Sequence, residues 1–230
     1  DDDMSPVFGR VLTAMVTPMT PDGSEVDHAQ AARLAAHLVD DLGHDGLVIN
    51  GTTGESPTTT DEEKRALLDA VVTAVGDRAS IVAGVGTFST AHTIELARQA
   101  ASMGVDGLLV VTPYYSRPPM DALETHFRTV ADSTHLPIML YDIPHRTGTA
   151  IPEEMLIGLA QHPNIRAVKD AKGDVASSSV VMANSELAYY AGDDAMLLPL
   201  LAVGGVGVVG TSTHFTGLAA REIIDAFLAG

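Results

Sequence analysis

Lys169 is the residue whose type and position most directly suggest chemistry. It ends the apolar run 165–169, where it would share a strand face with Ala167. A lysine at the mouth of a barrel is partly desolvated, and this lowers the pKa of its amine and frees the amine to attack a carbonyl. The alternative is a solvated lysine at a strand end, paired with Asp170. Position alone does not decide between a Schiff-base lysine and a surface lysine.

Tyr141 and Arg146 follow one another closely in the segment before Lys169. Tyr141 ends the apolar run 137–141, and its phenol either relays protons to a nearby amine or caps the core with its hydroxyl in water. Arg146 carries a planar fork that suits a carboxylate, so it is a candidate substrate anchor in an acidic chain, with a surface arginine as the alternative.

A turn with two hydroxyls between glycines stands at 51–54 (GTTG), followed by Glu55. The backbone N–H groups of such a turn, with the hydroxyls of Thr52 and Thr53, can bind a carboxylate or relay protons. An ordinary turn that leads into the next helix explains the same residues equally well.

The elements that must position these side chains alternate along the whole chain. Short runs rich in Val, Ile and Leu are typical of parallel strands buried on both faces. The runs are 11–16, 46–49, 81–85, 107–111, 137–141, 165–169, 187–191 and 206–209. Amphipathic stretches of helical length lie at 27–42, 61–75, 91–103, 121–133, 152–161, 177–184, 194–203 and 216–228. This alternation, with a period of about 28 residues, predicts an α/β fold and a closed (β/α)8 barrel, in which chemistry belongs on the loops after each strand.

Composition excludes several classes of protein. The 230 residues include 13 basic and 30 acidic residues, a net charge of −17, so we expect no nucleic-acid partner and no association with an anionic membrane. No apolar run reaches the roughly 18 residues of a membrane span. Cysteine is absent, which excludes disulfides and thiol nucleophiles. The nine histidines lack the spacing of metal ligands, so we expect no metal and no other cofactor.

The start of the chain differs from a secretory leader. Residues 1–3 are all Asp, whereas a signal peptide begins with basic residues. We therefore expect a cytoplasmic protein, with residues 1–7 as an N-terminal tail, residues 1–3 as an added remnant ahead of Met4, and residues 8–230 as a single barrel domain.

Taken together, the motifs resemble those of the dihydrodipicolinate synthase family, within the N-acetylneuraminate lyase superfamily. The matching stretches occur in family order and at family-like spacing from about Phe8 to Gly230. They are 51–57 (GTTGESP), 111–118 (VTPYYSRP), 140–148 (LYDIPHRTG), 168–174 (VKDAKGD) and 191–194 (AGDD). Family members usually continue for several helices after the eighth barrel helix; since the sequence stops at Gly230, we expect a barrel without that extension.

The resemblance implies a Schiff-base lyase that condenses pyruvate with aspartate 4-semialdehyde on the way to diaminopimelate and lysine. It implies that Lys169 forms the imine, and that Tyr141, Thr52 and Tyr115 form a proton relay, with Tyr115 reaching in from a neighbouring subunit of a homodimer or homotetramer. Pocket roles follow for four further residues. By resemblance, Thr53 holds the pyruvate carboxylate, Arg146 binds the semialdehyde carboxylate, and Gly192 and Val209 line the pocket through their backbones.

Two alternatives remain beside this interpretation. One is an aldolase or lyase of the same fold that acts on another 2-keto acid, although Thr52 and Arg146 favour the synthase over sialic acid lyases. The other is an inactive barrel used for assembly, against which intact Lys169, Tyr141 and Thr52 argue. In lysine-inhibited relatives a separate site uses His, Asn and Glu side chains. The corresponding residues here are Asp61, Lys64, Phe88 and His92, which predicts weak or no inhibition by lysine.

Overall fold

The computed structural model describes residues 5–230, and its strands close into one parallel barrel. Neighbouring strands pair in chain order, and β8 returns to pair with β1. The strands are β1 (Val11–Ala14), β2 (Gly46–Ile49), β3 (Ser80–Gly84), β4 (Gly107–Val111), β5 (Ile138–Asp142), β6 (Ile165–Asp170), β7 (Ala188–Ala191) and β8 (Gly207–Gly210). The predicted (β/α)8 barrel is therefore confirmed.

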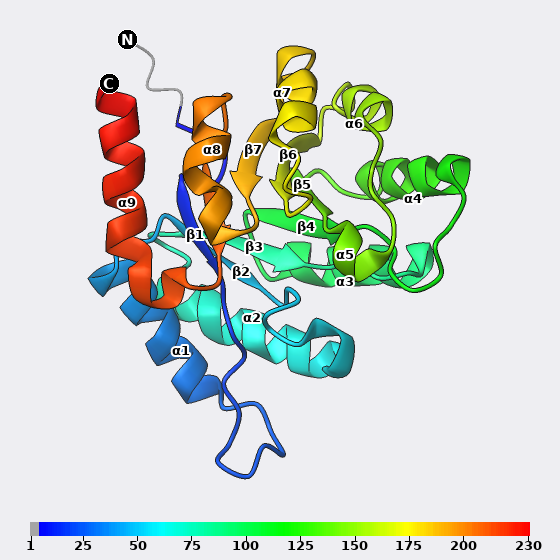
Figure 1. Ribbon diagram of the computed structural model, residues 1–230. Helices are drawn as coiled ribbons and strands as arrows, with labels where there is room; N and C mark the ends of the chain where they lie inside the picture. Colours follow the sequence, from blue (N-terminus) through cyan, green and yellow to red (C-terminus); the bar gives the residue numbers. More distant parts are fainter. Residues whose placement is uncertain (1–4) are drawn as a thin grey trace.

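Helices surround the strands on the outside of the barrel (Figure 1). They are α1 (His28–Ala36), α2 (Asp61–Val75), α3 (Thr90–Ser102), α4 (Met120–Asp132), α5 (Pro144–Thr147), α6 (Glu153–Leu159), α7 (Val175–Ala183), α8 (Leu197–Ala202) and α9 (Thr213–Ala229). The short α5 was not predicted, and it directly follows β5. Single turns of 3₁₀ helix stand at Ser56–Thr58 and Asp194–Met196.

Two helices illustrate how the local sequence determines where a helix begins or ends. Thr60 accepts a hydrogen bond from the Glu63 N–H while the Glu63 carboxylate accepts one from the Thr60 N–H, a capping box that starts α2. The helix predicted over 27–42 remains α-helical to Ala36 and then widens into a π-helical turn at His37–Asp41. There the Leu42 N–H donates to the His37 carbonyl, five residues back.

The strands bury both faces, as their consecutive apolar residues predicted. Along β1, Val11 packs outward against the helices, whereas Leu12 and Ala14 point into the barrel. At the end where the strands begin, the barrel interior is filled by Phe8 and Tyr190, and the Tyr190 hydroxyl donates to the Gly9 carbonyl at 2.7 Å. This packing leaves space for a ligand at the opposite end, where the strands finish.

The ends of the chain bear on two expectations. Residues 1–4 lie outside the described residues, so the tail predicted over 1–7 and the remnant predicted at 1–3 stay predictions, although Val7 already packs against the barrel interior. Among residues 5–230, no helix has both the length and the apolar character to cross a membrane.

Candidate active site

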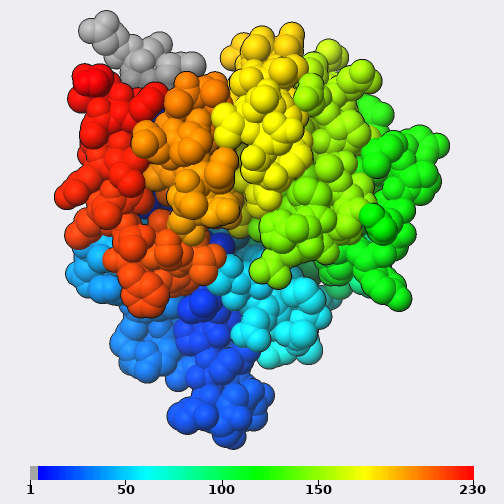
Figure 2. Space-filling view, in the orientation of Figure 1, coloured from blue at the N-terminus to red at the C-terminus, as the bar shows by residue number. Residues whose placement is uncertain are grey.

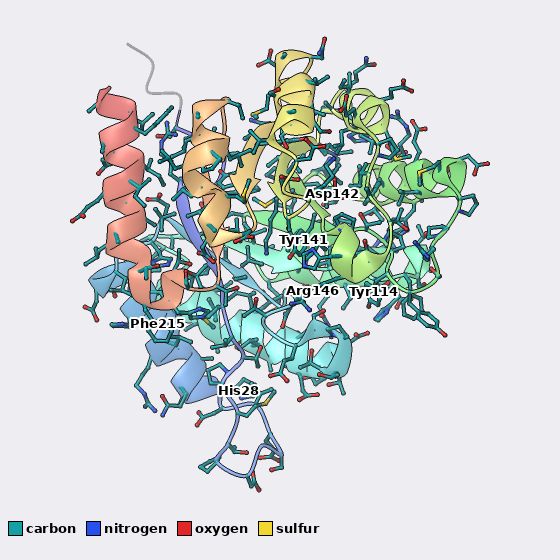
Figure 3. All side chains as sticks on the ribbon, in the orientation of Figure 1. His28, Tyr114, Tyr141, Asp142, Arg146 and Phe215 are labelled. Atoms are coloured by element: carbon teal, nitrogen blue, oxygen red, sulfur yellow. The ribbon has the colours of Figure 1, made fainter. Side chains whose placement is uncertain are left out.

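A cavity of about 210 Å³ opens at the end of the barrel where the strands finish. Thr52, Tyr141 and Arg146 line it, although they come from three different segments. The other lining residues are Asn50, Gly51, Ser56, Pro57, Gly84, Gly86, Leu109, Val111, Tyr114, Ile143 and Thr147. Figure 3 shows Tyr141 near the middle of the barrel, with Arg146 and Tyr114 beside α5. In Figure 2, segments from both ends of the chain meet around this centre.

Lys169 lies beside the cavity rather than on its wall. It is 4% exposed, and its Nζ stands 4.1 Å from the centre of the Tyr141 ring. The pKa of Lys169 is lowered to about 8, mainly by burial; the Asp194 carboxylate acts in the opposite direction, and the Arg146 guanidinium adds to the lowering. A substantial fraction of this amine is therefore uncharged slightly above neutral pH, which is the state that attacks a carbonyl.

Tyr141 is the direct β5 partner of Lys169 on β6, so the two side chains share the interior face of the barrel. Burial raises the pKa of Tyr141 to about 12, although the Arg146 charge works in the opposite direction. The phenol is consequently protonated at neutral pH and can donate a hydrogen bond or a proton into the cavity that it lines.

The two threonines of the 51–54 turn face different neighbours. Thr52 lines the cavity, whereas the Thr53 hydroxyl lies 3.3 Å from the Thr211 hydroxyl, after β8. The turn is held by a hydrogen bond from the Thr17 hydroxyl to the Gly54 carbonyl at 2.7 Å. A loop after β1 thus fixes the loop after β2 and, with it, both hydroxyls.

Arg146 reaches the cavity from α5, the short helix that was not predicted. That helix runs from Pro144 to Thr147 and is capped by Gly148, which adopts φ +79°, a conformation that favours glycine. The Arg117 guanidinium donates to the Gly148 carbonyl at 2.7 Å and ties the loop after β4 to this helix. The backbone that carries Arg146 is therefore held in place at the rim.

Gly192 lies next to Lys169, and Val209 lies in the interior cluster that contains Tyr141. A Cβ on Gly192 would come within 3.1 Å of the Lys169 Cγ and of the Asp170 carbonyl oxygen, so a larger residue would crowd the lysine stem. Val209 is 1% exposed and packs in the interior cluster that includes Tyr141. Neither is among the residues that line the cavity.

Tyr115 is the predicted site residue that the structure does not bring to the others. Its side chain is 90% exposed and its φ is +69°, which is uncommon for a residue with a bulky side chain. Its neighbour Tyr114, which the sequence reasoning missed as a site residue, lines the cavity instead and packs edge-on against Phe88 with ring centres 5.3 Å apart. Burial raises the pKa of the Tyr114 phenol. Nothing in the sequence indicates which of the two adjacent tyrosines lines the cavity.

A charged network behind the site was also missed. Asp142 and Asp170 directly follow Tyr141 and Lys169, and they face outward as paired neighbours on β5 and β6. Lys172 lies 3.4 Å from Asp142 and donates its backbone N–H to Asp170. Burial raises the pKa of both carboxyl groups. Lys172 thus serves as counter-ion to this pair.

Asn50 is a further lining residue that sequence reasoning passed over. It stands directly after β2 at φ +63°, and its Oδ1 is buried without a hydrogen-bond partner among residues 5–230. In the same described residues, no three His, Asp or Glu side chains gather in a way that could hold a metal ion.

Comparison with known proteins gives consistent results. A model of the dihydrodipicolinate synthetase family matches residues 7–230. A curated relative from Cutibacterium acnes, named 4-hydroxy-tetrahydrodipicolinate synthase, is 63% identical over 98% of this chain and 77% of its own length. A second relative of that name, from Acidothermus cellulolyticus, is 64% identical over 97% of this chain and 72% of its own length. The crystal structure of the Cyanidioschyzon merolae dihydrodipicolinate synthase with lysine bound superimposes with a TM-score of 0.95 at 42% identity, covering 97% of this chain and 76% of that one. The chain belongs to the dihydrodipicolinate synthetase family.

Proposed function

We propose that this chain is a 4-hydroxy-tetrahydrodipicolinate synthase, which joins pyruvate to aspartate 4-semialdehyde. The Lys169 amine adds to the pyruvate ketone and expels water to form an imine. The imine draws electrons from the pyruvate methyl group, which loses a proton and becomes an enamine. The enamine carbon attacks the aldehyde carbon of the semialdehyde, whose oxygen takes up a proton. The amino group of the semialdehyde then displaces Lys169 and closes the ring.

The observation that carries this proposal is the state of Lys169. Its amine is buried, its pKa is lowered to about 8, and it touches the ring of a tyrosine that lines a cavity. A buried amine with an adjacent phenol has both parts that imine chemistry needs, a nucleophile and a proton donor.

The other residues take roles that match their positions. Tyr141 and Thr52 line the cavity and exchange protons with the reacting carbons and oxygens. Thr53 and the N–H groups of its turn hold the pyruvate carboxylate. Arg146, on the rim, pairs with the semialdehyde carboxylate through its planar fork. The backbones of Gly192 and Val209 shape the pocket beside Lys169.

Tyr115 completes the relay from a second copy of the chain in a homodimer or homotetramer. Two observations support this role: the side chain is almost wholly exposed, and its backbone is held in a left-handed conformation that directs it away from its own barrel. An exposed tyrosine fixed in this way fits a contact with another subunit better than it fits a solvent-facing loop.

The net charge bears on the kind of substrate that we propose. A net charge of −17 suits an enzyme that takes small molecules and not nucleic acid, and the positive charge for anionic substrates is local, at Arg146 and Lys169. We place the enzyme in the cytoplasm, by analogy with the biosynthetic synthases that it resembles.

The test is covalent trapping. Pyruvate with borohydride should add a reduced pyruvyl group to the peptide that contains Lys169, as seen by mass spectrometry. Lys169→Arg should lose the adduct and the activity. Lys172, three residues away and paired with Asp142, is the internal control, because it should remain unlabelled.

Two further measurements separate the alternatives. Aspartate semialdehyde should support turnover after pyruvate binding, whereas an enzyme for another 2-keto acid would trap pyruvate without this turnover. An inactive barrel would give no adduct in a folded sample. Light scattering should report a dimer or larger, and a fully active monomer would contradict the assignment of Tyr115.

A further inference from the structure

His214 lies at the start of α9 and has no role in the proposed mechanism. Its side chain is buried, and its two ring nitrogens contact backbone groups of two different loops. Nδ1 lies 2.6 Å from the Thr211 carbonyl oxygen, in the loop after β8, and the Val16 N–H, in the loop after β1, donates to Nε2 at 3.2 Å. β1 and β8 are paired strands, and α9 packs against both (Figure 1). One imidazole therefore joins two neighbouring loops at the mouth of the barrel.

The partners of the imidazole determine where its proton lies. A carbonyl oxygen only accepts hydrogen bonds, so the Nδ1 that faces Thr211 must carry the proton. A backbone N–H only donates, so the Nε2 that faces Val16 must offer its lone pair. The neutral ring with its proton on Nδ1 is the form that makes both bonds.

The loop after β1 contacts the turn at 51–54 directly. Thr17, the residue after Val16, donates its hydroxyl to the Gly54 carbonyl at 2.7 Å. A Cβ on Gly54 would come within 3.1 Å of the Met15 carbonyl oxygen, so the loop and the turn are also closely packed. A shift of this loop would therefore be passed to the turn.

The loop after β8 contacts the same turn from another side. The Thr211 hydroxyl lies 3.3 Å from the Thr53 hydroxyl. The Asp194 carboxylate accepts hydrogen bonds from the N–H groups of Thr211 and Ser212 at 3.1 Å and 3.3 Å, and so anchors this loop. The turn is thus supported by two loops, and His214 bonds to both of them.

We propose that His214 is a positioning residue for pyruvate binding. It holds the loops after β1 and β8 in a fixed relation, and these loops hold the Thr53 hydroxyl and the N–H groups of its turn where the pyruvate carboxylate is received. The effect on pyruvate rests on the proposed function, in which this turn binds that carboxylate. The link between the two loops does not depend on the substrate.

Two substitutions of His214 test the link. In His214→Gln the side-chain amide reaches the place of Nε2 and offers an oxygen to the Val16 N–H. His214→Leu keeps an apolar side chain of related size but has no acceptor. His126→Leu is the matched control, because His126 is also buried and bonds the Thr90 hydroxyl between α4 and α3, away from the turn.

Hydrogen exchange of the ligand-free enzyme, read by mass spectrometry, reports the link without pyruvate. In His214→Leu the peptide that contains Val16 and Thr17 should exchange about tenfold faster or more, because the Val16 N–H has lost its acceptor. In His214→Gln its rate should stay close to that of the unmodified enzyme. Long-range ¹H–¹⁵N NMR of the unmodified enzyme should show the His214 ring neutral and protonated on Nδ1.

Steady-state kinetics then report the positioning role. In His214→Leu the KM for pyruvate should rise about three- to tenfold, and His214→Gln should largely restore it. The KM for aspartate semialdehyde should change less than about twofold, since Arg146 reaches the cavity from α5 and not from these loops. His126→Leu should melt at a lower temperature and keep both KM values.

Each result has a distinct meaning. Unchanged exchange of the Val16 peptide in His214→Leu, or a ring protonated on Nε2 alone, overturns the link between the loops. Faster exchange with an unchanged KM for pyruvate overturns the positioning role, as does an equal rise in both KM values or in His126→Leu. A His214→Gln enzyme as impaired as His214→Leu overturns the role of the acceptor. Failure of the unmodified enzyme to trap pyruvate on Lys169 overturns the proposed function and leaves the exchange result standing.

Discussion

Lys169 and Tyr141 are directly paired across β6 and β5, and the lysine amine lies against the face of the tyrosine ring at 4.1 Å. The ring face favours a cation, whereas burial favours the neutral amine, and burial dominates because the pKa of Lys169 falls to about 8. The amine can thus lose its proton to react and keep a stabilising contact once the imine is protonated.

Removal of the Tyr141 hydroxyl should separate imine formation from turnover. Tyr141→Phe keeps the ring beside Lys169, so pyruvate trapping should persist, while turnover should fall about a hundredfold or more because the proton relay is broken. Tyr190→Phe is the control, since that hydroxyl bonds the Gly9 carbonyl at the other end of the barrel. It should keep its turnover and lose about 1 kcal/mol of unfolding free energy. Full turnover in Tyr141→Phe would exclude this phenol from the relay.

The rate of imine formation should depend on pH through Lys169. Its pKa of about 8 lies below that of an ordinary lysine, and only the neutral amine attacks. The rate with pyruvate, followed by rapid quench with borohydride, should therefore rise as pH increases through about 8 and then level off. A midpoint near that of an exposed lysine, above pH 10, would show that the amine is not desolvated.

Arg146→Ala should affect the second substrate. Loss of a charge-assisted contact should raise the KM for aspartate semialdehyde about ten- to a hundredfold, while trapping of pyruvate survives. Because the Arg146 charge lowers the pKa of Lys169, the midpoint for imine formation should also move to higher pH. His145→Ala, its exposed neighbour, is the control and should change neither quantity. Equal losses for both substrates would indicate a structural role.

Lys172→Met should destabilise the fold in a pH-dependent way. It leaves Asp142 and Asp170 buried without their counter-ion, at a cost of about 3 kcal/mol in unfolding free energy at neutral pH. Burial already raises the pKa of both carboxyl groups, so their ionisation opposes folding as pH rises through those values. The loss should therefore shrink in urea titrations at acidic pH. Arg166 is an exposed cation on β6, so Arg166→Met should change the unfolding free energy little at neutral or acidic pH. A loss in Lys172→Met that did not depend on pH would argue against Lys172 as the counter-ion of Asp142 and Asp170.

Lysine should inhibit this enzyme weakly or not at all. Asp61, Lys64, Phe88 and His92 line a second cavity of about 190 Å³, in which the Lys64 amine bonds to the Ser56 and Thr59 carbonyls. That positive charge repels a lysine ligand, and Phe88 offers no acceptor for its ammonium. Initial rates across millimolar lysine should stay nearly constant. Lys64→Gln should bind lysine more tightly than the unmodified enzyme, whereas submillimolar inhibition of the latter would contradict the prediction.

The fold could be predicted because each strand is buried on both faces. Runs such as 46–49 and 107–111 coincide with β2 and β4, since strands that lie between the barrel interior and the helices are mostly apolar on both faces. The predicted strand ends differ from the observed ones where a polar residue continues a strand. The run predicted over 165–169 extends to Asp170 in β6, because the Asp170 carboxylate is buried with Lys172 nearby. The membership of the family was predicted from the ordered motifs and is confirmed.

The site could be predicted less completely, because its members meet through loops. Lys169, Tyr141, Thr52 and Arg146 were singled out by type and strand ends, but their roles stay predictions. Hydrophobic periodicity and composition do not tell which of two adjacent tyrosines points inward. In the structure Tyr115 has a positive φ and an exposed side chain, whereas Tyr114 lines the cavity.

Closure of the barrel links the first strand to the last. Thr13 pairs with Gly210, so the ring of strands cannot be completed until the chain has left the ribosome as far as Gly210. Until then β1 and β7 each present an unpaired edge, and such edges invite association with other nascent chains. Gly207–Gly210 is therefore a segment on which productive synthesis of the protein depends, although it contributes no side-chain functional group to catalysis.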